Sequence, residues 1–212
     1  MASIQGQPGP QVLSDGSVPN SALRSGKTGE LLLSELQARY YENAYRSNSF
    51  LAYSGGTAMT TPGTALVGLQ LWNSSPVSGS GAVNLVLKKT AGFIAVTSAT
   101  TTGITLCSGV GQTAAPTSTT AITAQKASNI TGSLGKGLAY NAGTFSNAPV
   151  AIWPLLHNTA AIATTGEDNG WQFDFEGSII VPPQSYVAIC TLGATAAAAA
   201  VFSSIIWDEV AI

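Results

Sequence analysis

The sequence predicts an all-β protein: a jelly-roll-type antiparallel β-sandwich with an extended N-terminal arm and one short helix. Three observations predict this fold class. From residue 49 onward the chain consists of short apolar runs separated by Gly, Pro, Asn, Ser and Thr, which is typical of strands joined by turns. Helical periodicity is confined to one segment near the N-terminus. The runs outnumber the eight strands of a jelly roll, so the surplus can form edge or arm strands; a nonstandard sandwich is the alternative.

Residues 1–27 are predicted to form the arm. They are rich in Gly, Pro, Ser and Gln and lack the apolar content needed for a core of their own. They also lack the basic region and the continuous apolar region of a secretory signal. Arg24 and Lys27 against Asp15 give the arm a net charge of +1, too little to neutralise nucleic acid. We therefore expect the arm to be ordered by contacts with other protein chains.

Residues 28–48 are predicted to form a short helix and linker. Ser34 followed by Gln37 fits a capping box at a helix N-terminus. Two acid–base pairs, each four residues apart with the acid first, support a helix from Glu35 to Arg46. The tyrosines on this helix are either packing groups or contacts for another chain.

Residues 49–212 are predicted to form the sandwich. The runs assigned to strands are Phe50–Tyr53, Ala65–Asn73, Ala82–Thr90, Phe93–Thr97, Ile104–Ser108, Ile122–Ala127, Val150–Leu155, Trp171–Phe175, Ser178–Val181, Tyr186–Leu192 and Val201–Trp207. The five consecutive alanines of Ala196–Ala200 favour a helix by propensity, but they lead directly into a strand. We interpret them as a strand whose small side chains permit close approach of a neighbouring sheet or chain.

Two of these runs alternate clearly. Trp171, Phe173 and Phe175 point to one side of their strand and polar residues to the other, which predicts one buried and one solvated face. In the run Val201–Trp207 both faces are largely apolar. This last strand is therefore expected to be central in its sheet or to pack against another subunit.

Charged residues make up 8% of the chain, well below the roughly 25% of ordinary soluble domains. Ala, Gly, Ser and Thr account for 100 of the 212 residues. Such a surface is expected to be neutral or to be hidden against partners. Residues 47–166 contain no acidic residue, and residues 167–212 contain no basic one. Either these blocks form complementary surfaces of neighbouring copies, or strands from the two blocks interleave in the fold.

The sequence contains no convincing catalytic constellation. His157 is the sole histidine and follows an apolar run, with no GxSxG motif in the chain, so we expect a structural role for it. Asp174 and Glu176 lie two residues apart on one predicted strand, about 7 Å from each other, a spacing open to an inverting glycosidase. A single alternating strand gives this spacing by default, so we interpret them as solvated charges.

No cofactor or metal is expected. Cys107 and Cys190 lie in apolar stretches without CxxC spacing, which predicts buried, inert thiols. A disulfide between them requires that their strands face each other. The adjacent acids Glu167-Asp168 and Asp208-Glu209 lack the spacing of a calcium loop. No apolar run reaches the length of a membrane span, and the acidic pI with scattered Lys and Arg offers no nucleic-acid surface.

Four segments carry a resemblance to a known family. They read GELLLSELQARYYENAYRSNSF, VGLQLWNSSPVSGSGAVNLVLKK, FEGSIIVPPQSYVAI and SSIIWDEVAI. In these blocks, which cover about half of the chain, the sequence resembles a family of tailed-bacteriophage virion structural proteins. The shared features are a RYYE-AYR-type helix after a Gly-rich arm, an LWN hairpin, a VPP step and a tryptophan-acid terminus.

The resemblance implies a non-enzymatic virion protein, and we expect a capsid decoration (cement) protein. Its expected partners are the major capsid protein or other virion proteins and two further copies of itself in a homotrimer, with no direct nucleic acid and no membrane. It would be assembled in the host cytoplasm and reside on the phage head. Candidate assembly contacts are Arg24, Lys27, Arg39, Tyr40, Tyr41 and Trp207.

Two alternatives stay open. The first is a tail or head-fibre module that binds a host surface glycan through exposed aromatic residues, with Trp72, Trp153 and Trp171 as candidates. The second is a hydrolase built on Asp174 and Glu176.

Overall fold

A computed structural model of the chain describes residues 44, 47–94, 103–127, 135–156, 170–193 and 200–212. The chain divides into two units, Met1–Tyr41 and Glu42–Ile212. The predicted arm and all of the predicted helix except Ala44 lie outside the described residues, as does the alanine strand except Ala200. The fold below is that of the second unit.

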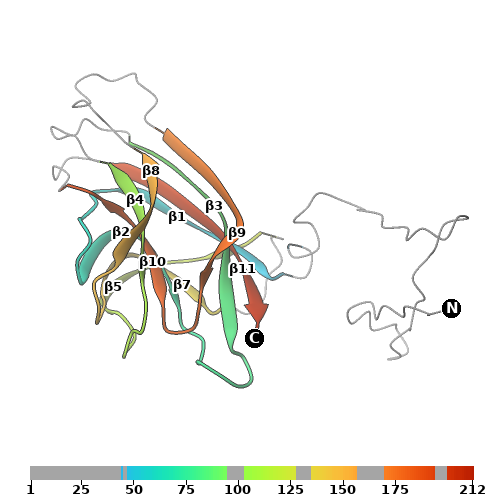
Figure 1. Cartoon of the computed structure of the whole chain (residues 1–212). Helices are drawn as coiled ribbons and strands as arrows, with labels where there is room; N and C mark the ends of the chain where they lie inside the picture. Colours follow the sequence, from blue (N-terminus) through green and yellow to red (C-terminus); the bar gives the residue numbers. More distant parts are fainter. Residues whose placement is uncertain (1–43, 45–46, 95–102, 128–134, 157–169, 194–199) are drawn as a thin grey trace, which may run out of the picture. The chain divides into compact units, whose positions relative to one another are not determined.

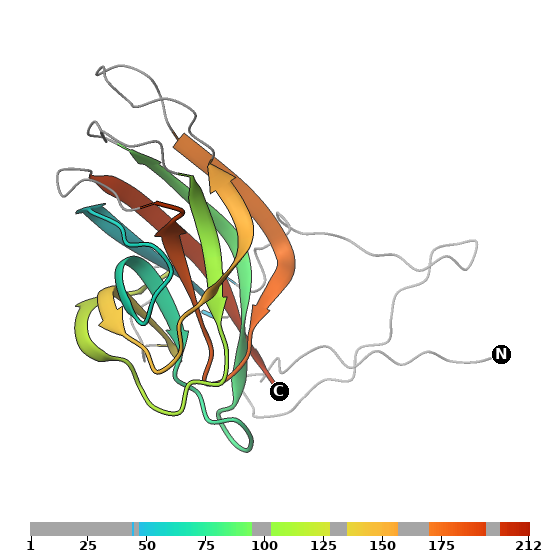
Figure 2. The same cartoon turned by 60° about the vertical axis from the view of Figure 1, so that its left-hand side comes forward.

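The described residues are almost entirely strands. The bounds are β1 (Ser49–Thr57), β2 (Ala65–Asn73), β3 (Val83–Ile94), β4 (Ile104–Gly109), β5 (Thr117–Ile122), β6 (Gln125–Lys126), β7 (Gly137–Thr144), β8 (Val150–Leu156), β9 (Gly170–Val181), β10 (Tyr186–Thr191) and β11 (Val201–Ala211). They form a five-stranded sheet in the order β6-β1-β11-β3-β9 and a six-stranded sheet in the order β5-β7-β2-β10-β4-β8. Every pairing is antiparallel, and the two sheets stack as a sandwich (Figures 1 and 2).

The strand order is that of a jelly roll. β1 pairs with β11, β2 with β10, β3 with β9 and β4 with β8, so that partners nest from the ends of the chain inward. This nesting results when one long antiparallel ribbon is rolled up, so that successive pairs belong alternately to the five-stranded and the six-stranded sheet. The predicted all-β sandwich is thus confirmed. Strands β5, β6 and β7 are an insertion between β4 and β8 that extends one edge of each sheet.

The main core lies between the two sheets. Leucines from β2 and β3 are fully buried there, together with Trp207 of β11, whose indole stacks on Phe50 of β1 at 5.8 Å between ring centroids. Full burial of each such side chain contributes about 1.5–3 kcal/mol. β11 is central in its sheet, as its two apolar faces predict.

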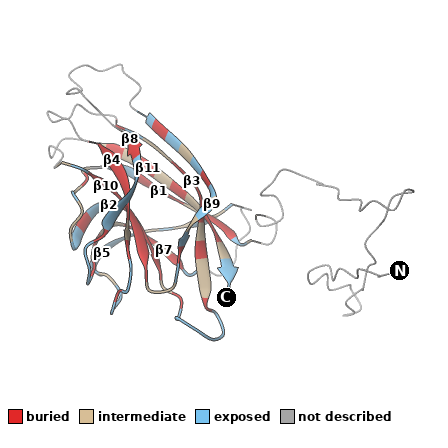
Figure 3. Cartoon of the chain, in the orientation of Figure 1, coloured by how far each residue is buried: buried red, intermediate tan, exposed pale blue. Residues whose placement is uncertain are grey.

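The six-stranded sheet is buried on its other face as well. A second cluster contains Leu66, Trp72, Cys107, Tyr140, Phe145, Tyr186, Ala188 and Cys190. The ring of Phe145 stacks on Tyr186 at 3.7 Å, and the Tyr186 hydroxyl donates to the backbone oxygen of Asn147 at 2.7 Å. Strand β10 is consequently buried along its whole length (Figure 3).

Several predicted strand bounds differ from the structure. Ala82–Thr90 and Phe93–Thr97 are joined in one strand as far as Ile94, β3, because Gly92 continues the strand instead of breaking it. Trp171–Phe175 and Ser178–Val181 are likewise one strand, β9, in which Glu176 and Gly177 have positive φ values of 48° and 85°.

Strands β1 and β11 extend beyond their predicted ends, to Thr57 and Ala211, and further differences lie in the insertion. The predicted strand Ile122–Ala127 is divided between the end of β5 and the short β6. Strand β7 was not predicted, because its sequence GLAYNAGT is composed mainly of small residues and lacks β-branched residues except at its end. Strand β2 has the predicted bounds, and in β9 the aromatic side chains alternate with exposed polar ones as expected.

Candidate functional site

The charged residues of the two sequence blocks meet inside the fold. Lys88 of β3 forms an ion pair with Asp208 of β11, with Nζ and Oδ1 3.0 Å apart, and both side chains are buried. Lys89 is paired in register with Asp174 of β9. Strands from the basic and acidic blocks therefore interleave in one sheet, the second of the two interpretations above.

The carboxylates of Asp174 and Glu176 are part of a bulge in β9. Four residues, 175–178, lie between the register partners of Leu87 and Lys89, where β3 has only one. Oδ1 of Asp174 accepts a hydrogen bond from the backbone amide of Glu176 at 3.0 Å, and both residues are exposed. A side chain that accepts a hydrogen bond from the amide two residues on is typical of aspartate in turns. This structural role explains the acid at position 174, and no proton-transfer role is needed.

Glu209 of β11 also has a structural partner. Oε1 of Glu209 accepts a hydrogen bond from the Gly137 amide at 2.8 Å. His157 and the pair Glu167-Asp168 lie outside the described residues. The part of the chain that is described holds no group of three or more His, Cys, Asp or Glu side chains placed to bind a metal ion. None of its helices is long and apolar enough to cross a membrane.

The two cysteines are buried free thiols on neighbouring strands, as predicted. Cys107 of β4 is paired with Ala188, and Cys190 of β10 with Thr105, so the thiols are diagonal neighbours on one face. The hydrogen bond with Cys107, together with burial, raises the pKa of Cys190, whereas the same bond lowers the pKa of Cys107. A thiol with a raised pKa is a poor nucleophile at neutral pH.

Of the residues proposed from the sequence as assembly contacts, Trp207 alone belongs to the described part of the chain. Arg24, Lys27, Arg39, Tyr40 and Tyr41 lie outside the described residues. Trp207 is fully buried between the sheets of its own chain, which leaves no ring surface for a partner.

The tryptophans proposed for glycan binding do not form a cluster. Trp72 and Trp171 are buried, on opposite sheets. Trp153 of β8 is partly exposed and contacts Phe175 edge-on at 6.0 Å between ring centroids.

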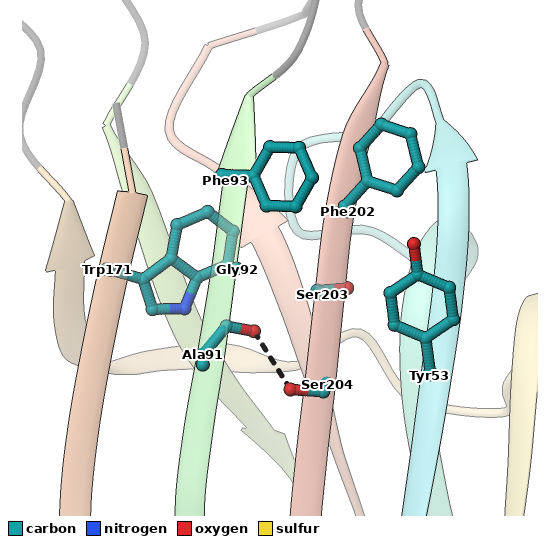
Figure 4. A pocket seen from close by; sticks show the side chains of 8 residues that line it. All are labelled: Tyr53, Ala91, Gly92, Phe93, Trp171, Phe202, Ser203 and Ser204. Carbon is teal, nitrogen blue, oxygen red and sulfur yellow. Dashed lines mark hydrogen bonds between the residues drawn. The ribbon is translucent and has the colours of Figure 1, made fainter. Parts of the chain in front are cut away.

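Three other aromatic side chains form a row on the outer face of the five-stranded sheet. Phe93 of β3 stacks on Phe202 of β11 at 4.7 Å and 7° between planes, and Tyr53 of β1 lies 6.3 Å from Phe202 at 29°. Tyr53 is 53% and Phe93 48% exposed. Figure 4 shows Phe93 and Phe202 side by side on neighbouring strands and Tyr53 on the next strand, further along it; we call the three rings the aromatic row. An open hollow of about 240 Å³ borders this row.

Edge strand β8 presents a second exposed apolar surface. Val150, Ile152 and Trp153 are 70%, 44% and 43% exposed, respectively. Among the described strands only β4 pairs with β8, so the other edge of its backbone has no strand partner in that part of the chain. Natural edge strands usually carry charges or prolines that discourage pairing. Here Pro154 is the only such residue in the strand.

Neither surface was found by sequence reasoning. Residues 53, 93 and 202 belong to three separate runs, and only the strand register places them in one row. β8 was predicted as a strand, but its edge position depends on the order of the sheet. Comparison of the chain with family models, curated proteins and solved structures found no match.

Proposed function

We propose that this chain is a non-enzymatic structural protein of a bacteriophage virion. In this proposal it is a decoration or cement protein that binds the head shell as a homotrimer and contacts the major capsid protein. The proposal combines the four resembling segments with the surface of the sandwich. Jelly rolls occur in capsid and lectin domains alike. Because a fold does not fix a function, the exposed residues of the sandwich have to distinguish the possible functions.

The exposed apolar edge of β8 is the observation that carries it. An edge strand with three exposed apolar side chains is a template for pairing with another chain. Covering Val150, Ile152 and Trp153 would remove apolar area from water, at about 25 cal/mol per Å². In a protein that is part of a lattice, such an exposed apolar edge becomes an interface, because a partner chain covers it in the assembled particle.

The low charge of the chain supports the same proposal. Of the basic residues in the sandwich, Lys88 is held in a buried ion pair. The residues of β8 are uncharged. The core of a protein interface is likewise poor in charged residues and rich in aromatic ones.

The test is binding to phage head shells that lack this protein, measured by co-sedimentation. The informative variant is Val150→Lys, and Val77→Lys is the matched control, because the two valines are 70% and 69% exposed. A lysine in a covered interface would be desolvated without a partner, so we expect Val150→Lys to weaken shell binding about tenfold or more. Val77→Lys should bind like the wild type. Equal binding by both variants, or no shell binding by the wild type, would refute the proposal.

A further inference from the structure

We infer that the aromatic row of Tyr53, Phe93 and Phe202 is a binding platform for a neutral oligosaccharide. This activity is distinct from shell binding by β8, and a different surface carries it. The row lies on the outer face of the five-stranded sheet, whereas β8 is an edge of the six-stranded sheet. Alternation along the strands places the three rings on the face opposite the core.

The three rings form one continuous apolar surface. Phe93 and Phe202 are parallel within 7° and stack on one another with an offset, at 4.7 Å between centroids, and Tyr53 adjoins Phe202 at 6.3 Å and 29°. The row crosses three neighbouring strands that are about 4.8 Å apart, so it runs for about 10 Å across the sheet. A sugar ring has an apolar face of C–H groups that packs on such a surface, and a row of this length accommodates more than one ring.

Hydroxyl and amide groups border the rings. The Tyr53 hydroxyl points toward Phe202 (Figure 4). Ser204 lines the hollow, and its hydroxyl donates to the backbone oxygen of Ala91 at 3.3 Å, which leaves it able to accept from a ligand. Gln172 is exposed on the adjoining strand, in register with Ala91. A few polar groups around an apolar surface can form hydrogen bonds with the hydroxyls of a sugar and so orient it.

The lining of the hollow carries no formal charge, which favours a neutral ligand. It consists of aromatic, Ala, Gly and Ser residues. Lys89 and Asp174, on the same two strands as Ala91 and Gln172, lie two residues further along and are register partners of opposite sign. A nucleic acid or an anionic polymer would need a positive surface at this place.

The size of the row favours a saccharide over a protein partner. A buried aromatic side chain covers about 150–250 Å², and Tyr53 and Phe93 are half-exposed while Phe202 is less so, so the three rings offer at most about 300 Å². A stable protein interface needs about 800 Å² from each partner. The platform is also firm, because Trp171 packs from the core side against Gly92, where a Cβ atom would come within 2.3 Å of the indole.

The experiment is affinity electrophoresis of the full chain in native gels. The gels contain dextran, laminarin, mannan or amylopectin as neutral probes, and alginate or heparin as anionic probes. We expect at least one neutral polysaccharide and neither anionic one to retard the protein. Phe93→Ala and Tyr53→Ala should each weaken the retardation about tenfold, the scale of one lost stacking ring. Tyr53→Phe keeps the ring and should have a smaller effect.

Val77→Ala is the control for loss of an exposed apolar side chain elsewhere, and circular dichroism melting verifies that each variant is folded. The ring variants should retain wild-type shell binding, so this test is independent of the one on β8. The inference is overturned if no neutral polysaccharide retards the wild type, or if the ring variants are retarded as strongly as the wild type. It is also overturned if they lose shell binding instead, because the row would then be covered by protein.

Discussion

The buried ion pair between Lys88 and Asp208 gives the sharpest stability prediction. Lys88 is the extra residue of a bulge in β3, since Leu87 and Lys89 pair with the consecutive residues Trp207 and Ile206 of β11. The bulge gives Lys88 a different direction from its neighbours. Its Nζ atom lies 3.0 Å from Oδ1 of Asp208 and donates to the Ser49 hydroxyl at 3.2 Å, and that hydroxyl in turn donates to Asp208.

The perturbation is Lys88→Met, which removes the positive charge and leaves a carboxylate buried. Both side chains are only 7% exposed, so water cannot replace the lost partner. Loss of one member of a buried pair costs about 3–5 kcal/mol. With a slope of about 2 kcal/mol per M in urea, the unfolding midpoint should fall by about 1.5–2.5 M. The double variant Lys88→Met/Asp208→Leu removes both charges and should recover most of this loss.

Urea unfolding followed by circular dichroism measures the effect. Lys136→Met is the matched control, because Lys136 is exposed and its substitution should change the free energy of unfolding by less than about 0.5 kcal/mol. A loss below about 1 kcal/mol for Lys88→Met would refute the reasoning. A double variant no more stable than the single one would refute it too, because the damage would then come from packing and not from the unpaired charge.

Two further predictions concern pH and the N-terminus. Burial raises the pKa values of Tyr186 and Tyr140, so their neutral forms stabilise the fold fully below the unfolded value of about 10, and this stability is lost as the pH rises above it. Melting temperatures should therefore drop between pH 9 and pH 11, and less so in Tyr186→Phe; a flat profile would contradict the burial argument. Deletion of residues 1–27 should leave a folded sandwich with the same melting temperature but weaker shell binding. Undiminished co-sedimentation would show that the arm does not contribute to shell binding.

Local patterns along the chain predicted much of the sandwich. Side chains of a strand alternate with a period of two, so Trp171 and Phe175 revealed the buried face of β9 without knowledge of its neighbours. Glycines were the main source of error, because a glycine marks either a turn or a close approach. Gly92 continues β3 because Trp171 lies against it, and that contact joins residues far apart in the sequence.

The sequence by itself determined the all-β class, the two apolar faces of the last strand and the buried cysteines, because composition and alternation act locally. Only the tertiary structure decided the nested pairing, the bulge that directs Lys88 to Asp208 and the open edge of β8. It also created the aromatic row, since Tyr53, Phe93 and Phe202 become neighbours through strand register alone. Register depends on pairings between distant segments, and one residue of slip would turn each ring to the other face.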